Sequence, residues 1–255
     1  MRKPGGAHTS RTMLLSDLRA VLASCPATAA SDDYRSAIID LNVAGKGSLS
    51  SRERTHRYLR ELYGLDPSLS VFLALRRLWD RDVESQPLVA MLVALSRDAT
   101  FSATSGGVVP VEVGKAVAAA DLAAAVEVVY PGAYSDAVRA KVGRNALSSW
   151  QQAGYLRRMS RRDVVRVPVR PGPAAVAMAL VLASEDRRSG QRLFEADVVG
   201  LLGMSLTNLH DRAHEAARKG WLDYRSRGTV TEVDLDALTA AADDTRMPLA
   251  VGSGP

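Results

Sequence analysis

The sequence lacks several features that define large classes of protein. It contains one cysteine, Cys25, among 255 residues, so an internal disulfide is excluded and a reducing compartment is expected. The longest apolar runs, residues 88–95 and 174–183, are far shorter than the ~20 residues that a membrane-spanning helix requires. The basic residues 1–11 include no apolar segment of signal-peptide length. We therefore predict a soluble, cytoplasmic protein without a membrane partner.

The sequence also lacks a complete catalytic or metal-binding motif. Residues 45–48 resemble a phosphate-binding loop, but Gly47 follows the lysine, and a helix is predicted where that loop requires a preceding strand. His210 and His214 lie one helical turn apart, as in zinc proteases, but Asp211 replaces the required glutamate and no third ligand lies nearby. Dinucleotide-binding and serine-hydrolase motifs are absent. We predict that the chain is not an enzyme, holds no metal or cofactor and acts on no small-molecule substrate.

The abundant residues favour helices and give the chain a net positive charge. Hydrophobic residues make up 47% of the chain, alanine is common, and aromatic residues contribute only 5%. This composition predicts a mainly α protein with substantial cores. The net charge of +5 permits a polyanionic partner without requiring one.

Capping residues, glycines and apolar spacing divide the chain into a helical bundle followed by two winged-helix-like modules. Within the bundle, Ser50 and Glu53 form a predicted capping box for a helix that buries Thr55, Leu59 and Leu62. The predicted segments are a flexible basic arm (1–13), a helical bundle (14–99), a Ser/Gly-rich linker (100–110), a first winged-helix-like module (111–170), a second winged helix (174–236) and a disordered tail (240–255).

The second module has the clearest local pattern, which is helix, tight turn, helix and hairpin. We predict a strand at residues 193–194, a short helix that ends at Gly203, and a longer helix capped by Ser205. Gly220 ends the longer helix, and residues 221–233 have the β-branched and turn residues of a hairpin.

The end of this pattern occurs twice in the chain. Residues 154–161 and 220–227 match in their glycine, aromatic, leucine, serine and arginine positions. A predicted helix precedes each copy, and a β-rich segment follows each. We interpret the two copies as tandem winged modules joined near residues 168–173. The alternative is a chance similarity between two helices that end in glycine.

The first module carries most of the positive charge. Its helix over residues 136–153 is predicted to bury Trp150 and to turn an acid-free face outward. Between Arg139 and Arg170 there are nine basic residues and one acidic residue, Asp163, which gives a local charge of +8. A basic helix alone is usually a solvated face, but an arginine-rich hairpin behind it favours nucleic acid. The predicted DNA-binding residues are Lys141, Arg144, Ser148, Gln151, Arg157, Arg158, Arg161, Arg162 and Arg166.

The second module is less suited to DNA by charge. Its outward helix face carries Asp211 and Glu215, which repel phosphate. Polar residues near the start of that helix and arginines in the hairpin are still candidate DNA contacts. These residues are Thr207, Asn208, Arg225 and Arg227.

Several residues between positions 42 and 63 are typical of a known family. They are Asn42, Lys46, Ser48, Ser51, Arg52 and the run from Leu59 to Tyr63. This region resembles the signature of the BrxA family of BREX (bacteriophage exclusion) systems. The resemblance extends over about residues 14–170, through the order of helices and the segment that ends at residues 153–156. It implies a NusB-like helical part and a small, non-catalytic DNA-binding component of a phage-defence system.

The leading hypothesis is therefore a double-stranded DNA-binding accessory component of a BREX system, with other BREX proteins as further partners. An ordinary winged-helix transcription regulator is the first alternative. A protein-interaction scaffold, whose acidic second helix docks a partner, is the other. DNA binding that weakens steeply with salt separates the first two from the scaffold.

Overall fold

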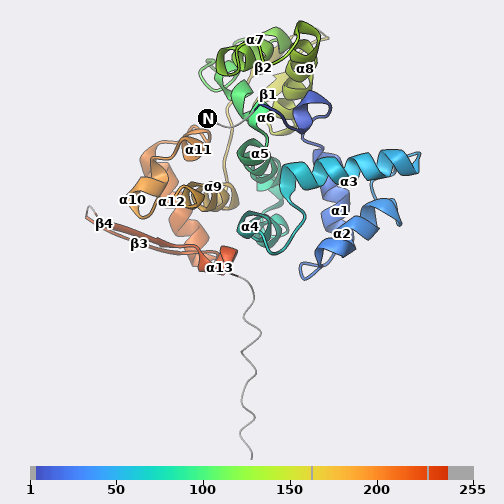
Figure 1. Ribbon diagram of the computed structural model, residues 1–255. Coiled ribbons are helices and arrows are strands. Elements are labelled where there is room, and N and C mark those ends of the chain that lie inside the picture. The colour runs from blue at the N-terminus through green and yellow to red at the C-terminus, as the bar shows by residue number, and fades with distance from the viewer. Residues whose placement is uncertain (1–3, 162, 229, 241–255) are drawn as a thin grey trace, which may run out of the picture.

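The computed structural model describes residues 4–161, 163–228 and 230–240. Within these residues the protein is mainly helical and has two small antiparallel sheets of two strands each, which confirms the predicted mainly α class (Figure 1). No helix in this part of the chain is long and apolar enough to cross a membrane.

The N-terminal part is built from short helices around one central helix. In chain order they are η1 (Ala7–Thr9), α1 (Leu15–Ser24), α2 (Ser31–Ile39), α3 (Leu49–Tyr63), α4 (Ser70–Trp79), η2 (Val83–Ser85), α5 (Gln86–Arg97), α6 (Ala99–Ala103) and η3 (Thr104–Gly107). Every side chain from Leu88 to Leu95 in α5 is buried. A helix that is apolar on all sides must be covered on all sides, and α3, α4 and α6 pack against it.

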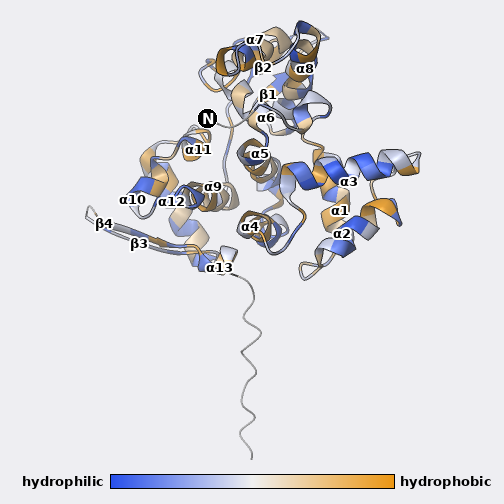
Figure 2. Ribbon diagram, viewed as in Figure 1, coloured by the Kyte–Doolittle hydropathy of each residue, from blue (hydrophilic) through white to orange (hydrophobic). Residues whose placement is uncertain are grey.

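A second helix with buried side chains on all sides joins the C-terminal part to the bundle. This is α9 (Pro173–Glu185), in which every residue from Pro173 to Ala183 is buried. It packs on both α4 and α5, so the bundle and the region predicted as the second module share one core. Figure 2 shows hydrophobic residues along α4, α5 and α9 in the middle of the molecule, whereas α3 is largely hydrophilic.

The first helix-and-hairpin unit follows the bundle. Its elements are α7 (Ala119–Val129), α8 (Asp136–Gln152), β1 (Leu156–Arg158) and β2 (Val164–Arg166). β1 and β2 pair in antiparallel register, with Leu156 opposite Arg166. Ala116 adds a bridge to Val165, so a third short extended segment lies beside β2.

The second unit also ends in a helix followed by a two-stranded hairpin. Its elements are α10 (Gln191–Phe194), α11 (Asp197–Gly200), α12 (Leu206–Arg218), β3 (Asp223–Arg227), β4 (Val230–Asp234) and α13 (Asp236–Thr239). The strand predicted at residues 193–194 is wrong, because Leu193 and Phe194 bury their side chains from the short helix α10. Of the predicted tail, residues 241–255 lie outside the described residues.

The two hairpins are entered in the same way, as the repeated sequence predicts. Gly154 and Gly220 have φ of 82° and 69°, a conformation that favours glycine at a helix end. Tyr155 N–H donates to Trp150 O at 3.0 Å, and Trp221 N–H donates to Ala216 O at 3.1 Å. These bonds span the same number of residues, so both helices end in the same glycine-dependent motif. The aromatic residue after each glycine is then buried.

Residues 4–13 are not the free arm that was predicted. Ala7, His8 and Met13 have no exposed surface. The His8 ring stacks on Phe101 with 3.9 Å between ring centroids and bonds Asp98 through Nδ1 at 2.8 Å. Each of these partners lies far along the chain, which is why composition alone gave the wrong expectation. Residues 1–3 lie outside the described residues.

Residues 100–110 are not a linker either. Helices α6 and η3 occupy most of this segment, and Phe101 and Thr104 are fully buried. A Cβ on Gly107 would lie 3.0 Å from the backbone oxygen of Asp121 in α7. The small residues that suggested a flexible linker therefore allow the chain to pass close to α7.

Helix α3 presents its apolar side to the core as predicted, although Ser48 caps it instead of Ser50, accepting a bond from Ser51 N–H. Leu59 is fully buried, and Arg54 is exposed. Leu59→Ala is therefore expected to lower the free energy of unfolding by about 2–5 kcal/mol, because it removes buried methyl groups and leaves a cavity. Urea denaturation measures the loss, and Arg54→Ala is the matched control, expected to change stability by less than about 0.5 kcal/mol. An unchanged midpoint for Leu59→Ala would contradict this packing.

Candidate nucleic-acid interface

The outer face of α8 is the first part of the candidate interface. Val142, Ala146 and Trp150 fix the opposite side of the helix in the core, and Trp150 Nε1–H donates to Thr104 Oγ1 at 3.0 Å. A Cβ on Gly143 would lie 2.1 Å from Ala119 O, so only glycine lets α7 pack this closely. The side chains turned outward are exposed Lys141 and Arg144 and half-buried Ser148 and Gln151.

The hairpin β1–β2 is the second part. Arg157, Arg158 and Arg161 are exposed. Asp163, the acidic residue between them and β2, accepts a bond from Ser160 Oγ–H at 2.5 Å, while its own N–H donates to Ser160 Oγ at 3.1 Å. The carboxylate of Asp163 is therefore hydrogen-bonded within the turn. Arg162 lies outside the described residues, so its prediction is untested.

Helix and hairpin enclose an open groove of about 620 Å³. Arg144 lines the helix side and Arg158 lines the hairpin side. Ser148 and Gln151, two further predicted contacts, lie on its wall. Among the described residues, no carboxylate lines this groove, so it concentrates positive charge at a concave surface.

Two basic residues counted in the local charge do not contribute to this surface. Arg166 is 7% exposed, lies over the Tyr155 ring at 4.6 Å and donates to the backbone oxygens of Tyr155 and Val167. Burial also lowers the pKa of its guanidinium. The prediction of Arg166 as a DNA contact is therefore wrong, because it lies on the inward-facing side of β2. Arg139 forms ion pairs with Glu127 and Asp136, so its charge is neutralised.

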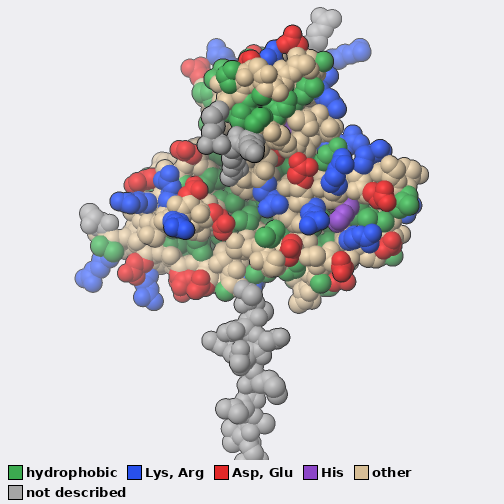
Figure 3. All heavy atoms as spheres, viewed as in Figure 1, with side chains coloured by type: hydrophobic (Ala, Val, Ile, Leu, Met, Phe, Trp, Pro, Cys, Tyr) green, Lys and Arg blue, Asp and Glu red, His purple; other side chains and the backbone are tan. Residues whose placement is uncertain are grey.

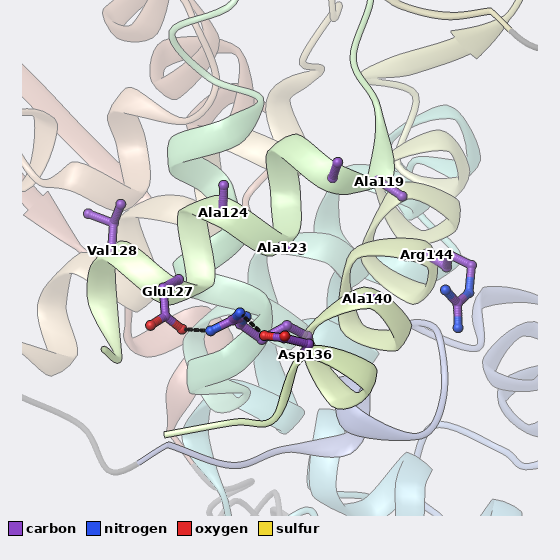
Figure 4. A pocket seen from close by; sticks show the side chains of 10 residues that line it. Ala119, Ala123, Ala124, Glu127, Val128, Asp136, Ala140 and Arg144 are labelled. Atoms are coloured by element: carbon purple, nitrogen blue, oxygen red, sulfur yellow. Dashed lines mark hydrogen bonds and ion pairs between the residues drawn. The ribbon is translucent and has the colours of Figure 1, made fainter. Parts of the chain in front are cut away.

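A second open groove lies between α7 and α8, on the other side of Arg144 (Figure 4). Its volume is about 810 Å³, and half of the residues that line it are alanines, among them Ala119, Ala123 and Ala140. Figure 4 shows the ion pairs of Glu127 and Asp136 at one end and Arg144 at the other. Between these charged side chains the groove is apolar, and it differs in kind from the basic groove next to it.

The second unit carries the other predicted contacts. Thr207 and Asn208 are exposed in the first turn of α12, which Ser205 caps through a bond from Asn208 N–H at 3.3 Å. Arg225 and Arg227 are exposed on β3. On the same helix, Asp211 is exposed, and Glu215 pairs with Arg212 at 2.7 Å. Asp211 is therefore exposed on α12 as predicted, and Glu215 is half-buried on the same helix.

His210 has a local partner in this unit. Its Nδ1 bonds Tyr224 Oη at 2.7 Å, its ring centroid lies 4.2 Å from that of Phe194, and burial lowers its pKa. Among the described residues, no group of three or more His, Cys, Asp or Glu side chains is arranged to hold a metal ion.

Sequence reasoning missed a buried chain of hydrogen bonds from Asp98 through His8 to Ser149. Asp98 Oδ2 bonds His8 Nδ1 at 2.8 Å, and His8 Nε2 bonds Ser149 Oγ at 2.9 Å. The order is that of a hydrolase triad. However, all three residues are buried, and Ser149 Oγ also accepts a bond from Met13 N–H and donates to Asn145 O. This hydrogen-bond network therefore fixes residues 8–13 against α8, and it has no open position for a substrate.

Comparison with known proteins gives no further guide to this surface. No family model matches the chain, and no curated protein matches it. The functional assignment consequently depends on the grooves, charges and element order described above, and the resemblance of residues 42–63 to the BrxA family stays a prediction.

Proposed function

We propose that the protein is a non-catalytic double-stranded DNA-binding protein. The basic groove between α8 and the β1–β2 hairpin is the observation that carries this proposal. Arg144 and Arg158 face it from both sides, and the described residues that line it include no carboxylate. A concave surface of one charge raises the local concentration of a polyanion. DNA is the polyanion whose grooves admit a helix of this size.

The order of elements supports the same proposal. A winged helix has the order helix, strand, helix, helix and hairpin. Here α6 and η3 stand at the place of the initial helix, and a short extended segment around Ala116 stands at the place of the first strand. They are followed by α7, α8 and the hairpin β1–β2. Gly114 N–H donates to Arg166 O at 2.8 Å, and Val117 N–H donates to Val164 O at 2.8 Å. In this reading α8 is the helix that approaches the major groove, and the hairpin is the wing.

The residue types assign roles within the interface. Arg157, Arg158 and Arg161 on the hairpin suit phosphate oxygens, which position the protein without reading sequence. Ser148 and Gln151 on α8 are the candidates for base edges. Most of the exposed arginines lie on the hairpin, where they suit phosphates better than base edges, so binding with little sequence preference is expected.

DNA affinity is expected to depend steeply on salt. If Lys141 and the four exposed arginines of this surface each neutralise a phosphate, the slope of log affinity against log salt is roughly −4.5. Affinity then falls about 10²–10³-fold between ~50 mM and ~200 mM salt. Fluorescence anisotropy with labelled duplexes of unrelated sequence measures this slope. Binding that is insensitive to salt, or absent at low salt, would contradict the proposal.

We further propose that this DNA-binding protein acts as an accessory component of a BREX phage-defence system, on the resemblance of residues 42–63 to BrxA. The genes that neighbour its own test this assignment directly. A fixed operator sequence with strong preference over random DNA would favour a transcription regulator instead. The acidic residues Asp211 and Glu215 on α12 favour a scaffold as a second candidate, in which that helix docks a protein partner.

A further inference from the structure

Helix α3 carries more exposed arginines than exposed carboxylates. Because Leu59 and Leu62 face the core, Arg54, Arg57 and Arg60 lie exposed on the outside. None of these three arginines forms an ion pair with another described residue. Two exposed acids, Glu53 and Glu61, lie on the same helix, so the arginines are in excess.

An aromatic ring holds two arginines in place at the centre of this surface. The guanidinium of Arg57 lies 4.7 Å from the centroid of the Tyr58 ring, and that of Arg11 lies 5.8 Å from it. A hydrogen bond with Ser10, with both arginines close by, lowers the pKa of the Tyr58 hydroxyl. Cation–π contacts reduce the freedom of these long side chains, so two positive charges are already oriented before a ligand arrives.

Arg11 also connects this surface to the basic groove. It belongs to the segment that is bonded to α8: Asn145 Nδ2–H donates to His8 O at 2.9 Å, and Leu15 N–H donates to Gln152 Oε1 at 3.2 Å. Gln152 lies on the wall of the groove that Arg144 and Arg158 line. Figure 3 shows Lys and Arg side chains gathered over α3 and along the adjoining edge of the unit that contains α8.

We propose that one DNA duplex occupies the groove at α8 and continues over residues 8–14 onto α3, where Arg11, Arg54 and Arg57 bind its phosphates. This inference rests on the proposed DNA binding and adds a second contact region to it. Tyr58 is flanked by the two guanidinium groups, so stacking with an unpaired base is less favourable here than contact with a phosphate backbone. Continuity with the groove favours DNA over an acidic protein as the occupant.

Counting phosphate contacts with the full-length protein tests this inference. Arg54→Ala with Arg57→Ala is expected to reduce the magnitude of the salt slope by about 2 and to weaken binding of a ~30 base-pair duplex by about 10–100-fold at ~0.1 M salt. The matched control is Arg192→Ala with Arg218→Ala, which removes the same charge from exposed positions in α10 and α12. Figure 1 places α10 and α12 on the opposite side of the molecule from α3. The control is expected to keep its affinity, and both variants to keep the wild-type melting temperature.

The outcomes separate this inference from the proposed function. If Arg54→Ala with Arg57→Ala binds DNA normally while Arg144→Glu with Arg158→Glu does not, the α3 contact is overturned and the groove stands. If neither change affects DNA binding, both ideas fail. An equal loss in the control would assign the effect to net charge and overturn the α3 contact. Unchanged DNA binding combined with lost binding of polyglutamate would assign α3 to an acidic protein and also overturn the inference.

Discussion

Asp98→Ala is expected to lower the free energy of unfolding by about 3–5 kcal/mol. The carboxylate is 1% exposed and serves three donors. Its Oδ1 accepts from Phe101 N–H at 2.9 Å, and its Oδ2 accepts from His8 N–H at 2.9 Å and bonds His8 Nδ1 at 2.8 Å. Alanine would leave all three groups buried without these partners and would remove the cap of α6.

Two further variants make this prediction specific. Asp98→Asn keeps an oxygen that can accept from Phe101 N–H but removes the charge, so we expect a smaller loss than for alanine. Asp40→Ala is the control, because Asp40 is exposed and its side chain accepts a bond from Ser36 Oγ–H at 2.9 Å on the same helix end. Chemical denaturation of the three variants measures the difference. A loss below about 1 kcal/mol for Asp98→Ala would show that the network contributes little to stability.

The features that could be predicted from sequence are those set by neighbouring residues. Ser135 and Ser205 cap α8 and α12 as predicted, because a hydroxyl accepts from an N–H three residues later. Gly154 and Gly220 end the same helices because both adopt positive φ. The apolar spacing of α3 and α8 also predicted which side chains are buried.

The features that could not be predicted depend on contacts between distant residues. His8 is held by Asp98 and Ser149, and nothing near position 8 indicates either partner. Arg166 adds to any count of charge, yet it is buried against Tyr155. Counting basic residues consequently overestimates the free charge of the first unit.

The same limit explains why the α3 surface was not among the predicted sites. Arg11, one of its members, was assigned to a free arm. Only the packing of residues 8–13 against α8 brings Arg11 beside Tyr58 and next to the basic groove. A site assembled from residues 11, 57 and 144 has no sequence motif, because its members come from three separate elements.

The largest effect on function is expected from charge reversal in the basic groove. Arg144→Glu with Arg158→Glu replaces two attractive phosphate contacts with two repulsive ones, and we expect DNA affinity to fall by more than about 100-fold at ~0.1 M salt. Both side chains are exposed, so the melting temperature should stay close to that of the wild type. Anisotropy titration in one buffer, together with a thermal melt, separates lost binding from lost folding.

Matched changes in the second unit decide whether it shares this role. Asp211→Ala with Glu215→Ala removes two charges that oppose phosphate and frees Arg212 from its ion pair, so DNA binding should be equal or slightly tighter. The same change should weaken any protein partner that docks on α12. DNA would be assigned to the wrong unit if reversal at Arg144 and Arg158 left affinity intact while changes in the second unit abolished it. The residues to change for that comparison are Thr207, Asn208, Arg225 and Arg227.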